Sequence, residues 1–349
     1  ALKWRAALAQ PAPRTLVTSG QGVAPNAYNE GALVAHEPER VLEGAALAAA
    51  ALQASELIVV IKRSYELQHQ RMSAALQRLQ AACPRLPFRV RIQHGPSLYI
   101  SGEETALLEF LEGRRAEPRV RPPYPSECGL FGRPTVVHNV ETAYWIARIA
   151  EQGAAAFAHG VPKLVSLSGA VHRPGIYPVK LGTTLSEIIS LGGGLSAGHT
   201  LKAVLIGGPG GALLPPERLD CPFEARALAA HGAAIGSGAL RVISSRCLLL
   251  EASDAAGFMA RESCGRCTPC RVGTQQLRDL CDQLCVSTAT SSSLAAIDDV
   301  THALRLGSAC GLGKSAPNLF ASLRRHFPQA IDAYLNGTPC PRRNQRAKP

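Results

Sequence analysis

The chain has 349 residues and a formal net charge of +11, with 46% hydrophobic, 18% charged and 5% aromatic residues. This composition is typical of folded globular proteins and excludes a disordered chain, and the length allows two or three domains. The longest run of only Ala and Leu, residues 45–52, is far shorter than the roughly 20 apolar residues that cross a bilayer, so we expect no direct membrane insertion. The basic residues are dispersed and aromatic residues are scarce, so we expect no nucleic-acid binding.

The start of the sequence and its cysteine content indicate the cellular location of the protein, and its C-terminal tail indicates a kind of partner. The sequence opens abruptly at Ala1 without Met, which suggests a fragment, and no signal peptide pattern follows. Eleven cysteines, three of them within seven residues, argue against a secreted disulfide framework and for metal ligands in a reducing compartment. We therefore expect a cytoplasmic location. A basic tail over residues 336–349 suits docking to an acidic partner.

The first part of the chain alternates predicted helices and strands. Residues 41–54 are rich in Ala and Leu and predict a helix, and the β-branched run 57–61 predicts a buried parallel strand. A second helix is expected over 65–82 and a second strand over 88–92. Because strands and helices alternate, an α/β layer is the predicted fold class. A proline-rich irregular connection follows over 116–135, and then a helix over 140–152.

From Lys163 onward the pattern changes to a compact β/α module of about 80 residues, a size within the range of small domains. Residues 164–171 predict a strand that ends in a turn, and a second strand starts near Pro174. Thr184 is the expected N-cap of a short helix over 185–191, with Glu187 as its capping-box partner. The module ends near Val242, and leucines at helical spacing after about Ala252 predict a C-terminal helical bundle.

Three cysteines in the C-terminal part carry the strongest chemical signal. Cys264, Cys267 and Cys270 have the C-x2-C-x2-C spacing of bacterial ferredoxins, which wraps three thiols around one iron–sulfur cluster. Cys310, 40 positions after Cys270 at the start of another predicted helix, is the candidate fourth ligand. Structural zinc on the same thiols is the alternative. Cys281 lies in line with apolar residues of the following helix, as does Cys285, so both are expected in the core.

At this cysteine loop the chain resembles the NADH-oxidising flavoprotein subunit of respiratory complex I and its relatives in NAD-reducing hydrogenases and NAD-linked formate dehydrogenases. Three further stretches agree with the family in its own order. Residues 100–106 resemble its G-E-E-T-A segment, residues 132–142 its G-K-P-T-x-x-N-N-V-E-T segment, and residues 163–175 the start of its β-grasp soluble-ligand-binding module. The resemblance covers nearly the whole chain.

The resemblance implies an FMN/NADH-binding α/β domain over residues 1–160, the β-grasp module over 161–245 and a 4Fe-4S helical bundle over 246–335. In this family NADH gives a hydride to FMN, which passes electrons singly to the cluster. The implied cluster ligands are Cys264, Cys267, Cys270 and Cys310. The resemblance implies two partners, a thioredoxin-like 2Fe-2S subunit and a large iron–sulfur subunit. Through this complex the chain would lie peripherally on the inner face of the membrane. The positions that match the family's binding residues for FMN and NAD(H) are Lys3, Gly102, Glu103, Glu104, Asn139 and Thr142.

Three departures from the family pattern concern the flavin site. The family's phosphate-cradling glycine loop lies just upstream of an L-K-W segment, and Leu2–Trp4 nearly open this chain, so that loop is missing from the sequence. The acidic turn N-A-D-E-G-E-P aligns with residues 18–24, where only Gly22 matches. The first Asn of N-N-V-E-T is His138.

The main hypothesis is an electron-transfer subunit of an NADH dehydrogenase-like complex, carrying electrons between NAD(H), FMN and a 4Fe-4S cluster. One alternative is a diaphorase subunit of an NAD-linked formate dehydrogenase or hydrogenase. A second is a non-catalytic paralogue that lost FMN and keeps the cluster as an electron wire or scaffold. A third is a zinc-stapled interaction protein.

Overall fold

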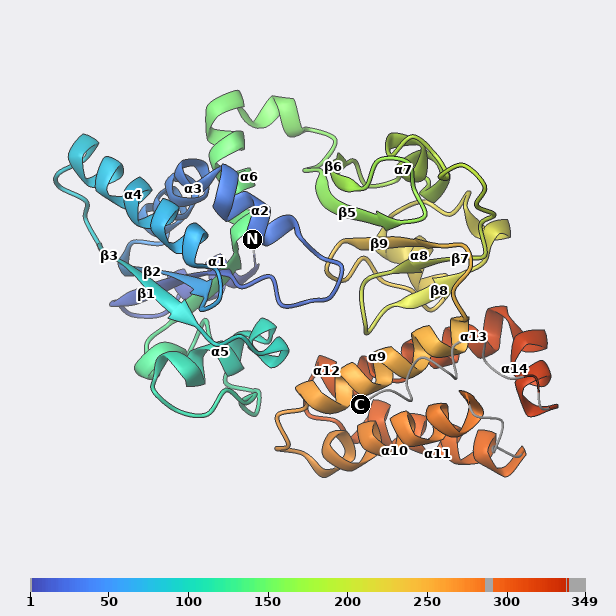
Figure 1. The fold of residues 1–349 in the computed structure, drawn as a ribbon. Helices are drawn as coiled ribbons and strands as arrows, with labels where there is room; N and C mark the ends of the chain where they lie inside the picture. The colour runs from blue at the N-terminus through green and yellow to red at the C-terminus, as the bar shows by residue number, and fades with distance from the viewer. Residues whose placement is uncertain (1, 286–290, 337, 339–349) are drawn as a thin grey trace. The chain divides into compact units, whose positions relative to one another are not determined.

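The computed structural model describes residues 2–285, 291–336 and 338, so nearly all of the expected basic tail lies outside the described residues. The chain divides into two compact units (Figure 1). Ala1–Val23 and Tyr28–Val161 form the first, and Ala24–Ala27 and Pro162–Pro349 form the second. The second unit therefore contains both the second sheet and the C-terminal helices.

The first unit is built on a four-stranded, fully parallel sheet in the order β3-β2-β1-β4. Leu57 to Ile61 of β2 are all 0% exposed, because helices or loops cover both faces of the sheet. The expected strand at 57–61 is confirmed as part of β2, and the strand expected at 88–92 is confirmed except that β3 begins at Arg89. The strand bounds are β1 (Arg14–Gly20), β2 (Ala54–Lys62), β3 (Arg89–Gly95) and β4 (Thr135–Asn139).

Helices cover the two faces of this sheet unequally. Four helices pack together on one face, and α5 lies on the other, where Leu107 and Leu108 contact Val17 and Val60 (Figure 1). The first of the expected helices ends at Ala51 instead of 54, because Gln53 adopts a positive φ and the chain enters β2 at Ala54. The helix bounds are α1 (Leu2–Leu8), α2 (Asn29–His36), α3 (Pro38–Ala51), α4 (Glu66–Ala82), α5 (Glu104–Leu111) and α6 (Val140–Gln152).

The second unit begins with a five-stranded mixed sheet in the order β6-β5-β9-β7-β8. The expected capping box is confirmed, because Thr184 accepts from the Glu187 backbone N–H and the Glu187 carboxylate accepts from the Thr184 N–H at 2.8 Å. The elements are β5 (Lys163–Gly169), β6 (Gly175–Val179), α7 (Leu185–Leu191), β7 (Ala203–Ile206), β8 (Ala212–Leu214), α8 (Ala225–Ala230) and β9 (Ala239–Ile243).

The remaining helices of the second unit pack against each other and against β8. Ser322 Oγ accepts from the Leu213 backbone N–H at 2.9 Å, which fixes α13 to the sheet. Within the described ranges, no helix is both long enough and apolar enough to cross a membrane. The helices are α9 (Leu248–Glu262), α10 (Thr268–Cys285), α11 (Ser291–Gly307), α12 (Gly311–Ser315), α13 (Asn318–His326) and α14 (Pro328–Leu335).

Two helices of the first unit approach so closely that only glycine fits between them. A Cβ added to Gly44 of α3 would lie 1.8 Å from the carbonyl oxygen of Ala143 in α6. Alanine residues flank this point on α3, and both helices bury small residues there. The contact holds α6 in place, and α6 in turn positions the end of β4.

We predict that Gly44→Ala destabilises the first unit by about 3 kcal/mol, because the backbone clash outweighs the roughly 1 kcal/mol that Ala gains over Gly in a helix. Both tryptophans of the chain, Trp4 and Trp145, lie in this unit, so urea unfolding followed by their fluorescence reports on it. Leu47→Ala, on the 45% exposed outer face of α3, is the matched control and should change little. A Gly44→Ala protein as stable as the parent would contradict this packing argument.

Candidate functional site

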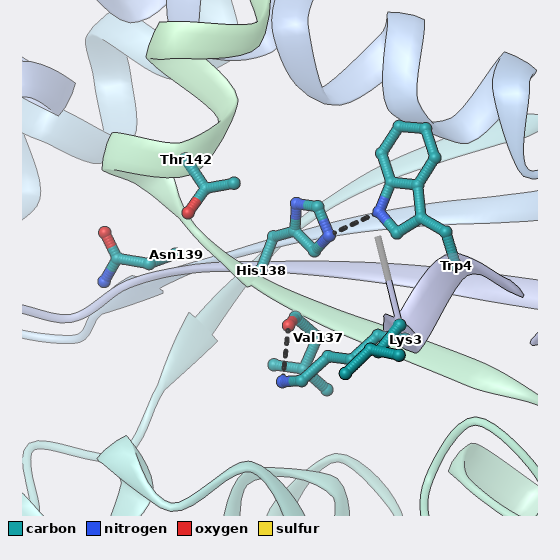
Figure 2. Close-up of a pocket in the computed structure, with 7 residues that line it drawn as sticks. Lys3, Trp4, Val137, His138, Asn139 and Thr142 are labelled. Carbon is teal, nitrogen blue, oxygen red and sulfur yellow. Dashed lines mark hydrogen bonds between the residues drawn. The ribbon is translucent and has the colours of Figure 1, made fainter. Parts of the chain in front are cut away.

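The strand order of the first sheet marks a ligand site at the ends of β1 and β4. β2 lies next to β1 and β3 lies next to β2, whereas β4 pairs with the opposite edge of β1, so the strand order reverses between β1 and β4. In open parallel sheets, ligands bind outside the carboxyl ends of the strands at such a switch point. A pocket of about 700 Å³ lies at the carboxyl end of β4, lined by Leu2, Lys3, Trp4, Val137, His138, Asn139 and Thr142 (Figure 2).

Helix α1 contributes a cation and an aromatic donor to this pocket. Lys3 Nζ donates to Glu104 Oε2 at 2.5 Å and to the Val137 carbonyl at 3.4 Å. Trp4 Nε1 donates to His138 Nε2 at 2.8 Å, as Figure 2 shows. These bonds join residues more than 100 positions apart, so α1 and β4 form one wall of the site.

His138 is held as a neutral ring. Burial, together with the positive charge of Lys3, lowers the pKa of His138 to about 4. Since Nε2 accepts the Trp4 N–H, the ring proton is on Nδ1. The pocket therefore has one cation, Lys3, beside a neutral imidazole.

The predicted cofactor residues do not all line the pocket. Lys3, Asn139 and Thr142 line it, whereas Gly102, Glu103 and Glu104 are not among its lining residues. Glu104 is joined to the pocket through its ion pair with Lys3.

Glu103 and Asn139, two of the predicted cofactor residues, each cap the start of a helix. Glu103 is the N-cap of α5, accepting from the Ala106 N–H at 2.8 Å, and its other oxygen pairs with Arg121. Asn139 is the N-cap of α6, accepting from the Glu141 N–H at 2.8 Å. Its amide also donates to Glu30 at 2.7 Å. The protein itself thus uses much of the hydrogen-bonding capacity of Glu103 and Asn139.

Three buried polar atoms at the switch point have no hydrogen-bond partner within the described residues: Thr18 Oγ1, Gln21 Nε2 and His138 Nδ1. Thr18 and His138 are paired in register on adjacent strands, and Gln21 follows β1 directly. Buried polar atoms without a partner are costly, so a ligand or water that completes them is expected. These donors and acceptors, with the nearby Lys3 cation, fit a polar planar group with an anionic tail, such as FMN.

The four predicted cluster cysteines lie close together at one end of the helical region. Cys264 and Cys267 belong to the loop between α9 and α10, Cys270 lies in the first turn of α10, and Cys310 is the N-cap residue of α12. The Ala309 backbone N–H donates to Cys267 Sγ at 3.5 Å, and Ser263 Oγ lies 3.3 Å from Cys270 Sγ. The loop and the start of α12, 40 residues apart in sequence, are thereby brought side by side.

The chemistry of this donor set fits an iron–sulfur cluster. Burial raises the pKa of the Cys270 thiol to about 11, and the neighbouring Cys267 and Cys310 thiols contribute to the rise. Burial also raises the pKa of Cys310, while N–H groups of α12 favour its thiolate. Four thiolates this close need a cationic centre, and N–H donors to the sulfurs are how proteins tune such clusters.

A single zinc ion and a 4Fe-4S cluster require different spacings of the four sulfurs. Among the described residues, no three His, Cys, Asp or Glu side chains are placed to hold a single ion. A tetrahedral zinc site with Zn–S bonds near 2.3 Å would need sulfurs about 3.8 Å apart. A 4Fe-4S cluster spreads its four thiolates over four irons, so the sulfurs need not converge on one point.

Together, the parallel-sheet pocket and the four-thiol set define an iron–sulfur flavoprotein. Comparison with protein families agrees: residues 1–148 match the Nuo51 FMN-binding domain, 164–213 the SLBB domain and 251–334 the NADH-ubiquinone oxidoreductase-F iron-sulfur binding region. The NADH-quinone oxidoreductase F subunit of Mycobacterium tuberculosis is 33% identical over 344 residues, covering 94% of this chain and 77% of the relative. The chain belongs to this family of NADH-quinone oxidoreductase F subunits, which confirms the resemblance found in the sequence.

Hydrogenase subunits are similar as well. NADP-reducing hydrogenase subunit HndC of Solidesulfovibrio fructosivorans is 29% identical over 97% of this chain and 73% of its own length. The crystal structure of an NAD+-reducing [NiFe]-hydrogenase in the H2-reduced state superposes with a TM-score of 0.89 at 35% identity, covering 96% of this chain. The chain spans 59% of that hydrogenase chain.

Sequence reasoning missed part of the pocket. Trp4 and His138 line the pocket but are not among the positions that the family motifs predict for the cofactors. The one available signal was the change from the family's Asn to His138. The partner of His138 could not be found this way, because Trp4 lies 134 positions away.

We predict that His138 makes the first unit less stable in acid. Below pH 6.5 the unfolded chain protonates this ring, but the folded chain does so only near pH 4, so the free energy of unfolding falls across this window by at most about 3 kcal/mol. His138→Asn should lose less stability between pH 7 and pH 4.5 than the parent, measured by urea unfolding with tryptophan fluorescence. Identical pH dependence in both proteins would show that the ring is not held neutral.

Proposed function

We propose that this chain carries electrons between NAD(H), FMN and one 4Fe-4S cluster as a subunit of an NADH dehydrogenase-like complex. The observation that carries the proposal is the assembly of Cys264, Cys267, Cys270 and Cys310 in the same chain as a switch-point pocket with unpartnered polar atoms. Bound FMN exchanges two electrons with a nicotinamide and single electrons with a cluster, which suits this combination.

The pocket residues would act by binding and orientation. Lys3 supplies the positive charge for an anionic cofactor, and Thr142 adds a hydroxyl from the first turn of α6. The unpartnered atoms of Thr18 and Gln21 would complete their hydrogen bonds on the polar edge of the ring system. Trp4 fixes the orientation of His138 and so the direction of its Nδ1–H.

Gly102, Glu103 and Glu104 are proposed for the dinucleotide side. Arg121 pairs with both glutamates, with 3.4 Å between Arg121 Nη1 and Glu104 Oε1. This pairing keeps two adjacent carboxylates in fixed positions. No carboxylate from residues 18–24 joins them, because that turn is neutral.

We further propose residues 1–160, 161–245 and 246–335 as the flavin, β-grasp and cluster domains. A thioredoxin-like 2Fe-2S subunit and a large iron–sulfur subunit are the proposed partners, in a complex peripheral to the inner face of a membrane. The related subunits come from multi-subunit oxidoreductases and hydrogenases, which supports partners of this kind. Both directions of electron flow, NADH oxidation and NAD+ reduction, are compatible with these residues.

One observation favours the second candidate, an electron wire without FMN. Gly20, the last residue of β1, aligns with the Asp of the family's acidic turn, and a Cβ there would lie 2.7 Å from a methyl group of Val140. The position is therefore packed against α6 and closed to a carboxylate. In this alternative the cluster remains and the pocket stays empty of flavin.

The cluster ligands can be tested one at a time. We predict that Cys267→Ser and Cys310→Ser remove most of the iron, the acid-labile sulfide and the EPR signal of the reduced, anaerobically purified protein. Cys281→Ala is the matched control, because Cys281 is 0% exposed in the core of α10 and is not a proposed ligand. It should keep the full signal. Stoichiometric zinc without sulfide in the parent protein would overturn the assignment.

A further inference from the structure

A buried hydroxyl group near the four proposed cluster ligands lacks a hydrogen-bond partner. Ser308, two residues before Cys310, is 4% exposed, and its Oγ makes no hydrogen bond to any residue that the structure describes. A buried hydroxyl without a partner costs free energy, because it has lost its hydrogen bonds to water. The described protein atoms alone therefore give no reason for a serine, instead of an alanine, at this position.

Close packing around Gly313 places this hydroxyl near the proposed ligands. A Cβ added to Gly313 would overlap Ser308 Oγ and would lie 3.0 Å from the Cβ of Cys270, so both side chains occupy the space beside this glycine. The backbone N–H groups of Leu312 and Gly313 donate to the sulfur of Cys310. The Ser308 hydroxyl therefore lies among the residues that pack directly against the proposed ligands.

A second serine shows how a hydroxyl acts on these thiols. Ser263 Oγ lies 3.3 Å from Cys270 Sγ. Burial raises the pKa of the Cys270 thiol, and the hydrogen bond from Ser263 opposes that rise. A hydroxyl that donates to a sulfur thus stabilises negative charge on it. Since the reduced form of a cluster carries one more negative charge than the oxidised form, each such donor raises the reduction potential.

We propose that the Ser308 hydroxyl donates a hydrogen bond to a sulfur of the bound 4Fe-4S cluster and raises its reduction potential. The inference rests on the proposed function, because it takes the four cysteines as ligands of such a cluster. Binding of the cluster would give the buried hydroxyl the partner that it lacks among the described residues. A higher cluster potential increases the driving force for each electron that passes from the flavin to the cluster.

An EPR-monitored redox titration of the anaerobically purified full chain measures this effect. Ser308→Ala should lower the midpoint potential of the cluster by about 59 mV, a tenfold change in the one-electron equilibrium. Ser263→Ala, which removes the hydroxyl beside Cys270, should shift the potential in the same direction. Ser322→Ala is the matched control, because Ser322 is also 4% exposed but bonds to Leu213 of β8. It should leave the potential unchanged.

Two further readouts separate the hydroxyl from packing. Ser308→Thr keeps the hydroxyl and should keep the parent potential. After exchange into D2O, pulsed EPR of the reduced cluster should show a weaker deuterium signal in Ser308→Ala than in the parent, because the exchangeable hydroxyl proton is gone. An unchanged potential or deuterium signal in Ser308→Ala, or an equal potential shift in Ser322→Ala, would overturn the inference. Absence of iron, acid-labile sulfide and the EPR signal from the parent protein would instead count against the proposed function.

Discussion

Four partly buried thiols, gathered from the cysteine loop, the first turn of α10 and the N-cap of α12, cannot all ionise unless a positive centre lies among them. Burial and the neighbouring thiols raise the pKa of Cys270 to about 11, so without such a centre this thiol keeps its proton at neutral pH. The helices of the second unit bring these residues together: α9 ends before the loop, α10 begins within it, and α12 supplies Cys310. Binding of an iron–sulfur cluster would turn mutual repulsion into the main stabilising interaction of this region.

The flavin pocket has a different electrostatic character. Its lining carries one cation and a neutral imidazole, and the turn after β1 has no carboxylate. Gly20 cannot be exchanged for an acidic residue without moving Val140, so the neutral turn is built into the packing of α6. The negative charge near the pocket comes from Glu104, and Lys3 balances it directly. In the proposed function, an anionic cofactor would be held by few charges and by hydrogen bonds to buried polar atoms.

Much of the fold could be predicted from local signals. The bounds of α6 follow from Asn139 at its start and Gly153 at its end, and those of α7 from the capping box at Thr184. β1 was not predicted although it lies inside the sheet, because its threonines are buried without an apolar run to mark them: Thr15 is 2% exposed and Thr18 is 0% exposed.

The site was predictable only where its residues are close in sequence. The spacing of Cys264, Cys267 and Cys270 predicts the cluster loop directly, and the loop lies inside the matched iron-sulfur binding region over residues 251–334. The Lys3–Glu104 ion pair joins positions 101 residues apart, and no local pattern could have shown it. Tertiary packing creates such contacts, so a single sequence carries little trace of them.

We propose that electrons pass through a flavin to the cluster within this chain. The most direct test is to mix anaerobic protein with NADH, with and without bound FMN, and to follow the cluster by freeze-quench EPR. We expect the reduced-cluster signal to appear rapidly when FMN is bound and not to appear without it. A cluster that is reduced equally well without FMN, or that stays oxidised when FMN is bound, would contradict it.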